Sequence, residues 1–349
     1  AFNMFQSLDP KHVYPSRRSD IYASNAVATS QPLATQAGIL MLQNGGNAVD
    51  AIVASAIALT VVEPVSNGIG SDAFSIVWDG TQLHGLNGSG RSPAAWTPDR
   101  FKGDDAMPTM GWDSVTVPGV VDAWFKLSER FGKLPFEQLF EPAIRYASEG
   151  FPVTPIIAKG WASAVETYRN YPEFCRTFLP HGRAPRVGEA FLCPQQAETL
   201  MEIAESKGES LYKGRLANLI ADAARRDGGA MTTDDLAQHE GFWVDCICQE
   251  FGDLLIHEIP PNGQGLAALI ALGVLDRLNI DQYPVNSADS VHLQIEAMKV
   301  GFAEAHRHVA DPDTVDIPIA TLLDPERLAT RASEVQLNQA SVPVAHISE

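Results

Sequence analysis

The segment from Ala48 to Val62 is apolar on every side that a helix would present, and Asp50 is its one charged residue. Asn47 can cap the start of a helix here, and Glu63-Pro64 would end it. The run is shorter than the ~20 apolar residues that a membrane-spanning helix needs. A helix without a polar face must be wrapped by protein on all sides. The chain is therefore expected to build a packed domain around this helix.

Further helices are predicted on both sides of this buried segment. An apolar face at helical spacing runs from Leu33 to Met41, and Gly45-Gly46 stop that helix. Ser287 can cap a long helix, and Thr232 can cap a shorter one. Helices are expected over residues 120–131, 136–147, 195–207, 216–226, 266–278, 288–310 and 325–332.

Strands are predicted mainly as hairpins. Two strand-like runs, residues 73–78 and 81–86, are separated by Asp79-Gly80, which is a strong hairpin signal. Further strands are expected over residues 26–30, 114–118, 242–251 and 254–258, and residues 168–194 read as a long loop. Short strands mixed with long helices indicate an α+β fold in which helices cover a sheet.

The composition is that of a globular protein. The chain has 349 residues, of which 45% are hydrophobic and 19% charged, so it can bury a large core. Residues 1–25 show no periodicity and are predicted to form an N-terminal arm, and residues 26–349 are predicted to belong to one domain. The formal net charge of −18 argues against a nucleic-acid or membrane-binding surface.

The start of the chain carries a weak signal about location. No secretory signal is visible, and a chain that opens on Ala1 is what removal of an initiator methionine would leave. We therefore predict a cytoplasmic protein. A periplasmic or secreted protein after signal removal is the alternative.

The candidate binding residue is Arg91, which follows the second strand of the predicted hairpin. It lies in the glycine-rich run Asn87–Pro93, where Gly88 and Gly90 would allow unusual backbone angles or a close ligand. An arginine keeps its charge and pairs in a two-pronged manner with a carboxylate. The run therefore predicts a site for a carboxylate-bearing substrate. The alternative is a surface turn in which Arg91 pairs with a carboxylate of its own chain.

The sequence gives little reason to expect a metal or a phosphate site. The predicted helix 288–310 carries two pairs of possible ligands that point in different directions, which favours solvated charges over a metal site. The pairs are His292 with Glu296 and Glu304 with His308, and His306 lies on the same predicted helix. Two Gly-x-Gly runs, at residues 68–70 and 263–265, lack the further residues of a phosphate loop. We predict neither a metal nor an organic cofactor.

A nucleophile is also not evident. The run around Ser89 comes near to a Gly-x-Ser-x-Gly elbow, but its glycines are one residue too close on both sides. No cysteine lies in a recognisable catalytic motif. The chain offers a clamp for a substrate without a group that attacks it.

A resemblance to a known family accounts for this absence. The chain resembles the large subunit of the gamma-glutamyltranspeptidase family of N-terminal-nucleophile hydrolases, in order from about residue 26 to about residue 331. The block Gly45–Ala51 is the most specific piece. The other matching runs are residues 28–34, 90–93, 117–121, 212–214 with 228–229, 260–263 and 287–289.

The resemblance implies a precursor that cuts itself into two subunits of one α/β/β/α sandwich. An N-terminal Thr of the small subunit would then attack the substrate amide, with its own α-amino group as the base. No catalytic residue would lie in this chain, and Arg91 would bind the α-carboxylate of a gamma-glutamyl donor. The small subunit would be the partner, in a heterodimer or a dimer of heterodimers.

Two alternatives stay open at this point. The runs 68–74 and 88–90 look more like the cephalosporin-acylase-like and transferase-like members, which favours an acylase for glutaryl or similar groups. A catalytically silent binding protein of the same fold is the other alternative.

Overall fold

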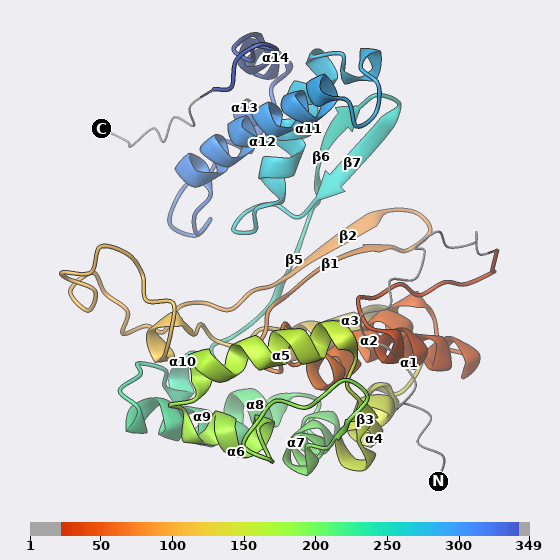
Figure 1. Cartoon of the computed structure of the whole chain (residues 1–349), viewed down its shortest axis with the longest axis vertical. Coiled ribbons are helices and arrows are strands. Elements are labelled where there is room, and N and C mark those ends of the chain that lie inside the picture. The colour runs from red at the N-terminus through yellow and green to blue at the C-terminus, as the bar shows by residue number, and fades with distance from the viewer. Residues whose placement is uncertain (1–21, 342–349) are drawn as a thin grey trace. The chain divides into compact units, whose positions relative to one another are not determined.

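The computed structural model describes residues 22–341, so most of the predicted N-terminal arm lies outside the described residues. The described chain forms two compact units. The first unit comprises residues 22–73 and 88–241, and the second comprises residues 74–87 and 242–341. Helices and short antiparallel strands together give the predicted α+β fold (Figure 1).

The first unit is built around the predicted apolar helix, α2 (Ala48–Val62). The side chain of Asn47 accepts hydrogen bonds from the first turn, and Asp50 accepts one from the Asn47 amide at 2.8 Å. The Asp50 carboxylate is fully buried and also accepts from the amides of Lys133 and Leu134. One short motif therefore caps the helix and fixes a loop that is distant in sequence.

Helices cover α2 on several sides, but Ile52 stays 47% exposed, so the expectation that protein wraps this helix on all sides is wrong within residues 22–341. The helix α1 (Pro32–Gln43) packs along it, and α3 (Val120–Phe131) and α4 (Glu141–Glu149) also contact it. The predicted helix 136–147 is in fact divided into the 3-10 turn η3 (Phe136–Phe140) and α4. The remaining helices of this unit are α5 (Pro155–Tyr168), α6 (Pro172–Phe178), α7 (Pro194–Glu205), α8 (Glu209–Lys213), α9 (Arg215–Arg226) and α10 (Thr233–Ala237).

Two predicted strands of this unit are wrong. Residues 26–30 form no strand and lead directly into the start of α1. There the Gln31 side chain caps the helix by accepting from the amides of Leu33 and Ala34. Of residues 114–118, Ser114 ends the 3-10 turn η2 (Trp112–Ser114), and residues 115–118 continue without a strand ladder. An apolar pattern alone does not distinguish extended chain from a paired strand.

The predicted long loop over residues 168–194 is wrong in part. It contains α6 and the strand β4 (Ala190–Phe191), which pairs with β3 (Phe151–Pro152). Aromatic side chains hold residues 168–194 against α5: the ring of Trp161 lies 4.7 Å from that of Phe191, centroid to centroid. The Trp161 indole also donates to the carbonyl of Phe178 at 3.0 Å.

The second unit contains a three-stranded sheet in the order β1 (Ala73–Trp78), β2 (Leu83–Gly88) and β5 (Phe242–Val244). The hairpin of β1 and β2 is confirmed, but β2 begins two residues later than predicted. The Asp79 carboxylate accepts from the amides of Thr81 and Gln82, which draws both residues into the turn. This side-chain bonding is what lengthens the connection.

The predicted strand over residues 242–251 is two strands in different sheets. It breaks at Asp245-Cys246 into β5, which pairs with β2, and β6 (Ile247–Phe251). The hairpin of β6 and β7 (Leu254–Glu258) turns at Gly252-Asp253 as predicted.

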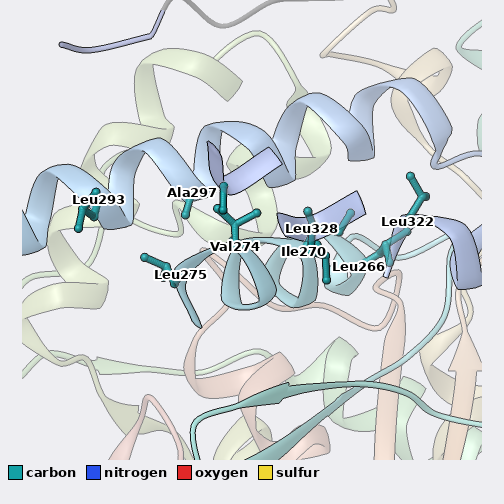
Figure 2. Close-up of a cluster of buried hydrophobic side chains, with 10 residues drawn as sticks. Leu266, Ile270, Val274, Leu275, Leu293, Ala297, Leu322 and Leu328 are labelled. Atoms are coloured by element: carbon teal, nitrogen blue, oxygen red, sulfur yellow. The ribbon is translucent and has the colours of Figure 1, made fainter. Parts of the chain in front are cut away.

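The core of the second unit lies between two long helices. The helices α11 (Gly265–Arg277) and α12 (Ala288–His308) lie side by side, and α14 (Pro325–Ser333) packs against α11. Figure 2 shows the buried side chains that meet there. A Cβ atom on Gly301 would lie 2.3 Å from the carbonyl oxygen of Ala267, so glycine is what allows α12 to approach α11. The short α13 (Ile319–Leu322) and the turn η4 (Ile280–Gln282) complete the unit.

The prediction that α12 carries only solvated charges is wrong for two of its residues. Glu296 and Glu304 are buried, at 2% and 3% exposure. The Glu304 carboxylate accepts from the guanidinium groups of Arg327 and Arg331, with His308 at 3.5 Å. Glu296 pairs with Lys299 at 2.6 Å. Burial opposes the ionisation of Glu304, but Arg331 and Arg327 outweigh it and hold the pKa below its usual value.

Replacement of Glu304 by Gln should lower the stability of the second unit at neutral pH by about 2 kcal/mol, because two guanidinium groups lose their buried acceptor. A lowered carboxyl pKa stabilises the fold above the unfolded-state pKa, and this contribution is lost as the pH falls through the folded-state pKa. The deficit of the variant should therefore shrink below about pH 4. Urea denaturation followed at pH 7 and pH 3.5 measures both effects.

The matched control is Glu334→Gln, since Glu334 is an exposed partner of the same Arg331. That variant should stay within about 0.5 kcal/mol of the parent protein at both pH values. Equal effects of the two substitutions would contradict the structural role assigned to Glu304.

Candidate functional site

The residue chosen from the sequence, Arg91, lies in a backbone corner that begins where β2 ends. The carbonyl of Arg91 accepts a hydrogen bond from the amide of Val117 at 3.0 Å. The amide of Gly90 donates to the Asp72 carboxylate at 3.2 Å. The amide of Ala94 donates to Asp235 at 2.8 Å. Three separate segments therefore hold the main chain on both sides of Arg91.

Two glycines make this corner possible. A Cβ atom on Gly90 would lie 1.5 Å from the carbonyl oxygen of Val117, and one on Gly119 would lie 2.0 Å from that of Gly88. Neither Gly88 nor Gly90 has a positive φ, so the expectation of unusual backbone angles there is wrong. The role of Gly90 is steric, because its main chain lies too close to that of Val117 for a side chain between them. Gly88 is also needed for packing, since a Cβ atom there would lie 2.7 Å from the Cβ of Ala123.

The segment 117–120, which lies against this corner, is also held by hydrogen bonds. The amides of Gly119 and Val120 both donate to the carbonyl of Ser71, at 3.1 and 2.9 Å. Asp235, which holds Ala94, also belongs to the capping box of α10 with Thr232. The corner is thus part of the folded body of the first unit, and Arg91 is an exposed residue on this support.

Three titratable groups lie near this corner. Partial enclosure of the Asp72 carboxyl group raises its pKa, which the Gly90 amide and His239 oppose. Burial raises the pKa of Asp122 as well. Burial lowers the pKa of His239, while Asp122 and Asp72 pull it upward. Sequence reasoning missed these groups, because no motif connects residues 72, 122 and 239.

Other sequence candidates have structural roles in the second unit. In the run 260–265, the Asn262 side chain accepts a hydrogen bond from the buried Asn87 at 2.7 Å, which ties this loop to β2. A Cβ atom on Gly265 would lie 2.5 Å from a carboxylate oxygen of Glu258. This glycine is needed for packing, and the run does not require a phosphate to explain it.

The structure gathers no candidate metal ligands into one site. Within residues 22–341, no group of three or more His, Cys, Asp and Glu side chains is arranged to hold a metal ion. In the same part of the chain, no helix combines the length and the apolar character required to cross a bilayer.

Replacement of Gly90 by Ala should force residues 88–91 away from Val117 and destabilise the first unit by about 1–3 kcal/mol, the range typical of overpacking. The amide of Val117 should also lose protection from hydrogen exchange, because its acceptor is the carbonyl of Arg91. Gly70→Ala is the control, since a Cβ there meets no atom within 4 Å. Similar melting temperatures for the two variants would show that the corner has room to adjust.

Comparison with known proteins agrees with these motifs. The sequence profile of the Gamma-glutamyltranspeptidase family matches residues 34–348. The Glutathione hydrolase-like YwrD proenzyme of Bacillus subtilis (strain 168) is 34% identical over 321 residues, which cover 91% of this chain and 61% of that protein. The chain thus spans about three fifths of this relative.

Solved structures show the same fold. A cephalosporin acylase from Bacillus halodurans is 45% identical with a TM-score of 0.89, over 94% of this chain and 63% of that one. A gamma-glutamyltranspeptidase from Pseudomonas nitroreducens, solved in complex with L-DON, is 29% identical with a TM-score of 0.86. That match covers 93% of this chain and 98% of the other. By sequence and by fold, this chain belongs to the gamma-glutamyltranspeptidase family.

Proposed function

We propose that this chain is the large subunit of a self-processed enzyme that cleaves amides and transfers the acyl group to water or to an amine. Arg91 binds a carboxylate of the acyl donor. The observation that carries the proposal is the position of Arg91: an exposed residue on a backbone corner fixed by hydrogen bonds on both sides.

A fixed corner suits this role because the clamp must hold the scissile bond at one place. A guanidinium binds a carboxylate through two parallel, charge-assisted hydrogen bonds. Misplacement by about 1 Å can reduce a rate 100-fold. An arginine on a mobile loop would bind the same group without aligning the amide.

The nucleophile in this proposal is an N-terminal Thr of a small subunit made from the same precursor. Two comparisons support a second subunit. The YwrD relative is called a proenzyme, and this chain covers 61% of it. The chain of the Pseudomonas nitroreducens transpeptidase has almost the same extent as this one, at 98% coverage. Residues 26–349 then form one domain together with the partner.

The sheet supports a partner as well. Alternate residues of β1 leave apolar side chains exposed: Phe74 at 45%, Ile76 at 39% and Trp78 at 60%. A strand with this alternation has one face suited to burial against another layer. In the proposed heterodimer, the small subunit covers this face, and the site needs neither a metal nor an organic cofactor.

A second candidate substrate follows from the 45% identity to the cephalosporin acylase. In that case the donor is a dicarboxylic acyl group such as glutaryl, and Arg91 holds a carboxylate with no neighbouring amine. Both candidates use the same clamp and the same acyl transfer. They differ only in whether the donor carries an amine next to the carboxylate that Arg91 binds.

Replacement of Arg91 by Ala should reduce kcat/KM for carboxylate-bearing donors by about 10- to 100-fold, the value of a lost charge-assisted contact. We would compare gamma-glutamyl, glutaryl and uncharged acyl anilides. The kcat/KM for the uncharged donor should change little. Of the two carboxylate-bearing donors, the one with the higher kcat/KM identifies the natural donor class. Arg91→Lys should retain part of the effect, because it keeps the charge without the fork.

The control is Arg169→Ala, since Arg169 is an exposed residue of the first unit whose partner is Glu166. It should leave all three donors unaffected. An Arg91→Ala variant that loses activity equally on charged and uncharged donors would exclude the clamp.

Self-processing is tested by the intact mass of the protein purified after expression of its full-length precursor. Two polypeptides are expected, and N-terminal sequencing of the smaller one should begin with Thr. A single unprocessed polypeptide without amidase activity would favour the silent binding protein of the same fold.

A further inference from the structure

His239 lies behind the Arg91 corner, in the turn that follows α10. Its side chain is 2% exposed, and its ring stacks on that of Tyr212 with centroids 5.2 Å apart and planes at 19°. The ring carbon Cε1 lies 3.2 Å from the place that a Cβ atom of Gly119 would occupy. The imidazole therefore stacks on Tyr212, and its Cε1 atom lies close to Gly119 in the segment that faces the corner.

The polar surroundings do not explain why a histidine is buried here. Among residues 22–341, its Nε2 atom has no hydrogen-bond partner, and the nearest Asp122 oxygen is 4.0 Å away. That oxygen already accepts the amide of Gly241 at 2.7 Å. The charges that act on the ring are those of Asp122, Asp72, Lys126 and Arg91. Burial lowers the pKa of the imidazole, which favours the neutral ring at neutral pH.

Tyr212 holds the same segment through its hydroxyl group. This hydroxyl donates to the carbonyl of Pro118 at 3.0 Å and accepts from the amide of Asp122 at 3.0 Å. The stacked pair therefore contacts Pro118 by a hydrogen bond and Gly119 by ring packing. Both residues belong to the segment 117–120, which also lies against residues 88–91.

The imidazole and the carbonyl of Gly88 occupy the same side of Gly119. The carbonyl oxygen lies 2.0 Å and the ring carbon Cε1 3.2 Å from the place of a Cβ atom, so the segment 117–120 is closely packed there. A smaller side chain at position 239 would leave a space into which residues 117–120 could move. The carbonyl of Arg91 would follow, because Val117 donates to it.

We propose that His239 is a positioning residue for the carboxylate site. Its ring, stacked on Tyr212, fixes where residues 117–120 pack and, through them, the position of Arg91. The inference rests on the proposed role of Arg91. His239 touches no substrate, and its part is to keep the clamp at a fixed distance from the attacking group.

The test compares His239→Ala with His239→Phe in the processed heterodimer. Alanine removes the flat ring, whereas phenylalanine keeps a ring of similar thickness without a titratable nitrogen. For a gamma-glutamyl or glutaryl anilide, His239→Ala should raise KM about tenfold or more, in line with the cost of small misplacements. For an uncharged anilide, its KM and kcat should stay within about twofold of the parent. His239→Phe should restore the low KM.

Two results would overturn the inference. One is an equal loss on charged and uncharged donors in His239→Ala, which indicates a general loss of fold. The other is a failure of His239→Phe to restore KM in a protein with normal thermal stability. If His239→Ala does not fold, His239→Gln takes its place with the same expected selectivity.

The Arg91→Ala measurement separates this inference from the function on which it rests. If Arg91→Ala shows no selective loss, the proposed function itself fails, whatever His239 does. If Arg91→Ala is selective and His239→Ala is not, only the positioning role fails.

Discussion

The main chain of residues 88–91 lies directly against that of residues 117–119, and the first unit depends on this contact. Carbonyl oxygens occupy the space in which the Cβ atoms of Gly90 and Gly119 would stand. Such an approach leaves the backbone groups close enough to bond to one another, as Val117 and Arg91 do at 3.0 Å. It also makes the corner stiff, because neither side has a flexible side chain that can yield.

This stiffness is what an arginine clamp requires. The guanidinium ends a long, flexible side chain, so the precision of the site must come from the backbone that carries it. The surrounding anchors come from three different parts of the first unit: Ser71 and Asp72 before the sheet, Val117 before α3, and Asp235 in α10.

Membership of the gamma-glutamyltranspeptidase family gives this clamp a chemical context. The chain supplies a cationic corner, and among its own residues no sequence motif supplies a nucleophile. In the proposed heterodimer, recognition and bond breaking belong to two polypeptides from one gene. The exposed apolar residues of β1 provide the kind of surface that such a second polypeptide would cover. The proposed role of His239 agrees with this division, since the residue that positions Arg91 would then also belong to the large subunit.

Local sequence determined much of the secondary structure. The boundaries of α2 and α3 were predicted to the residue, because a cap and a hydrophobic period act within a few positions of one another. The corner that carries Arg91 was found from its glycines, and the family from colinear motifs.

Other features were decided only by the tertiary structure. The predicted strands at residues 26–30 and 114–118 do not form. The first run leads into the local cap of α1, whereas in the second Val117 bonds to the distant carbonyl of Arg91. The burial of Glu304 and the packing of His239 against Tyr212 likewise leave no local mark. The sequence alone singled out Arg91 as a candidate, and the fold alone decided why the glycines around it are needed. Two main chains meet there, and contact between distant segments depends on the path of the whole chain.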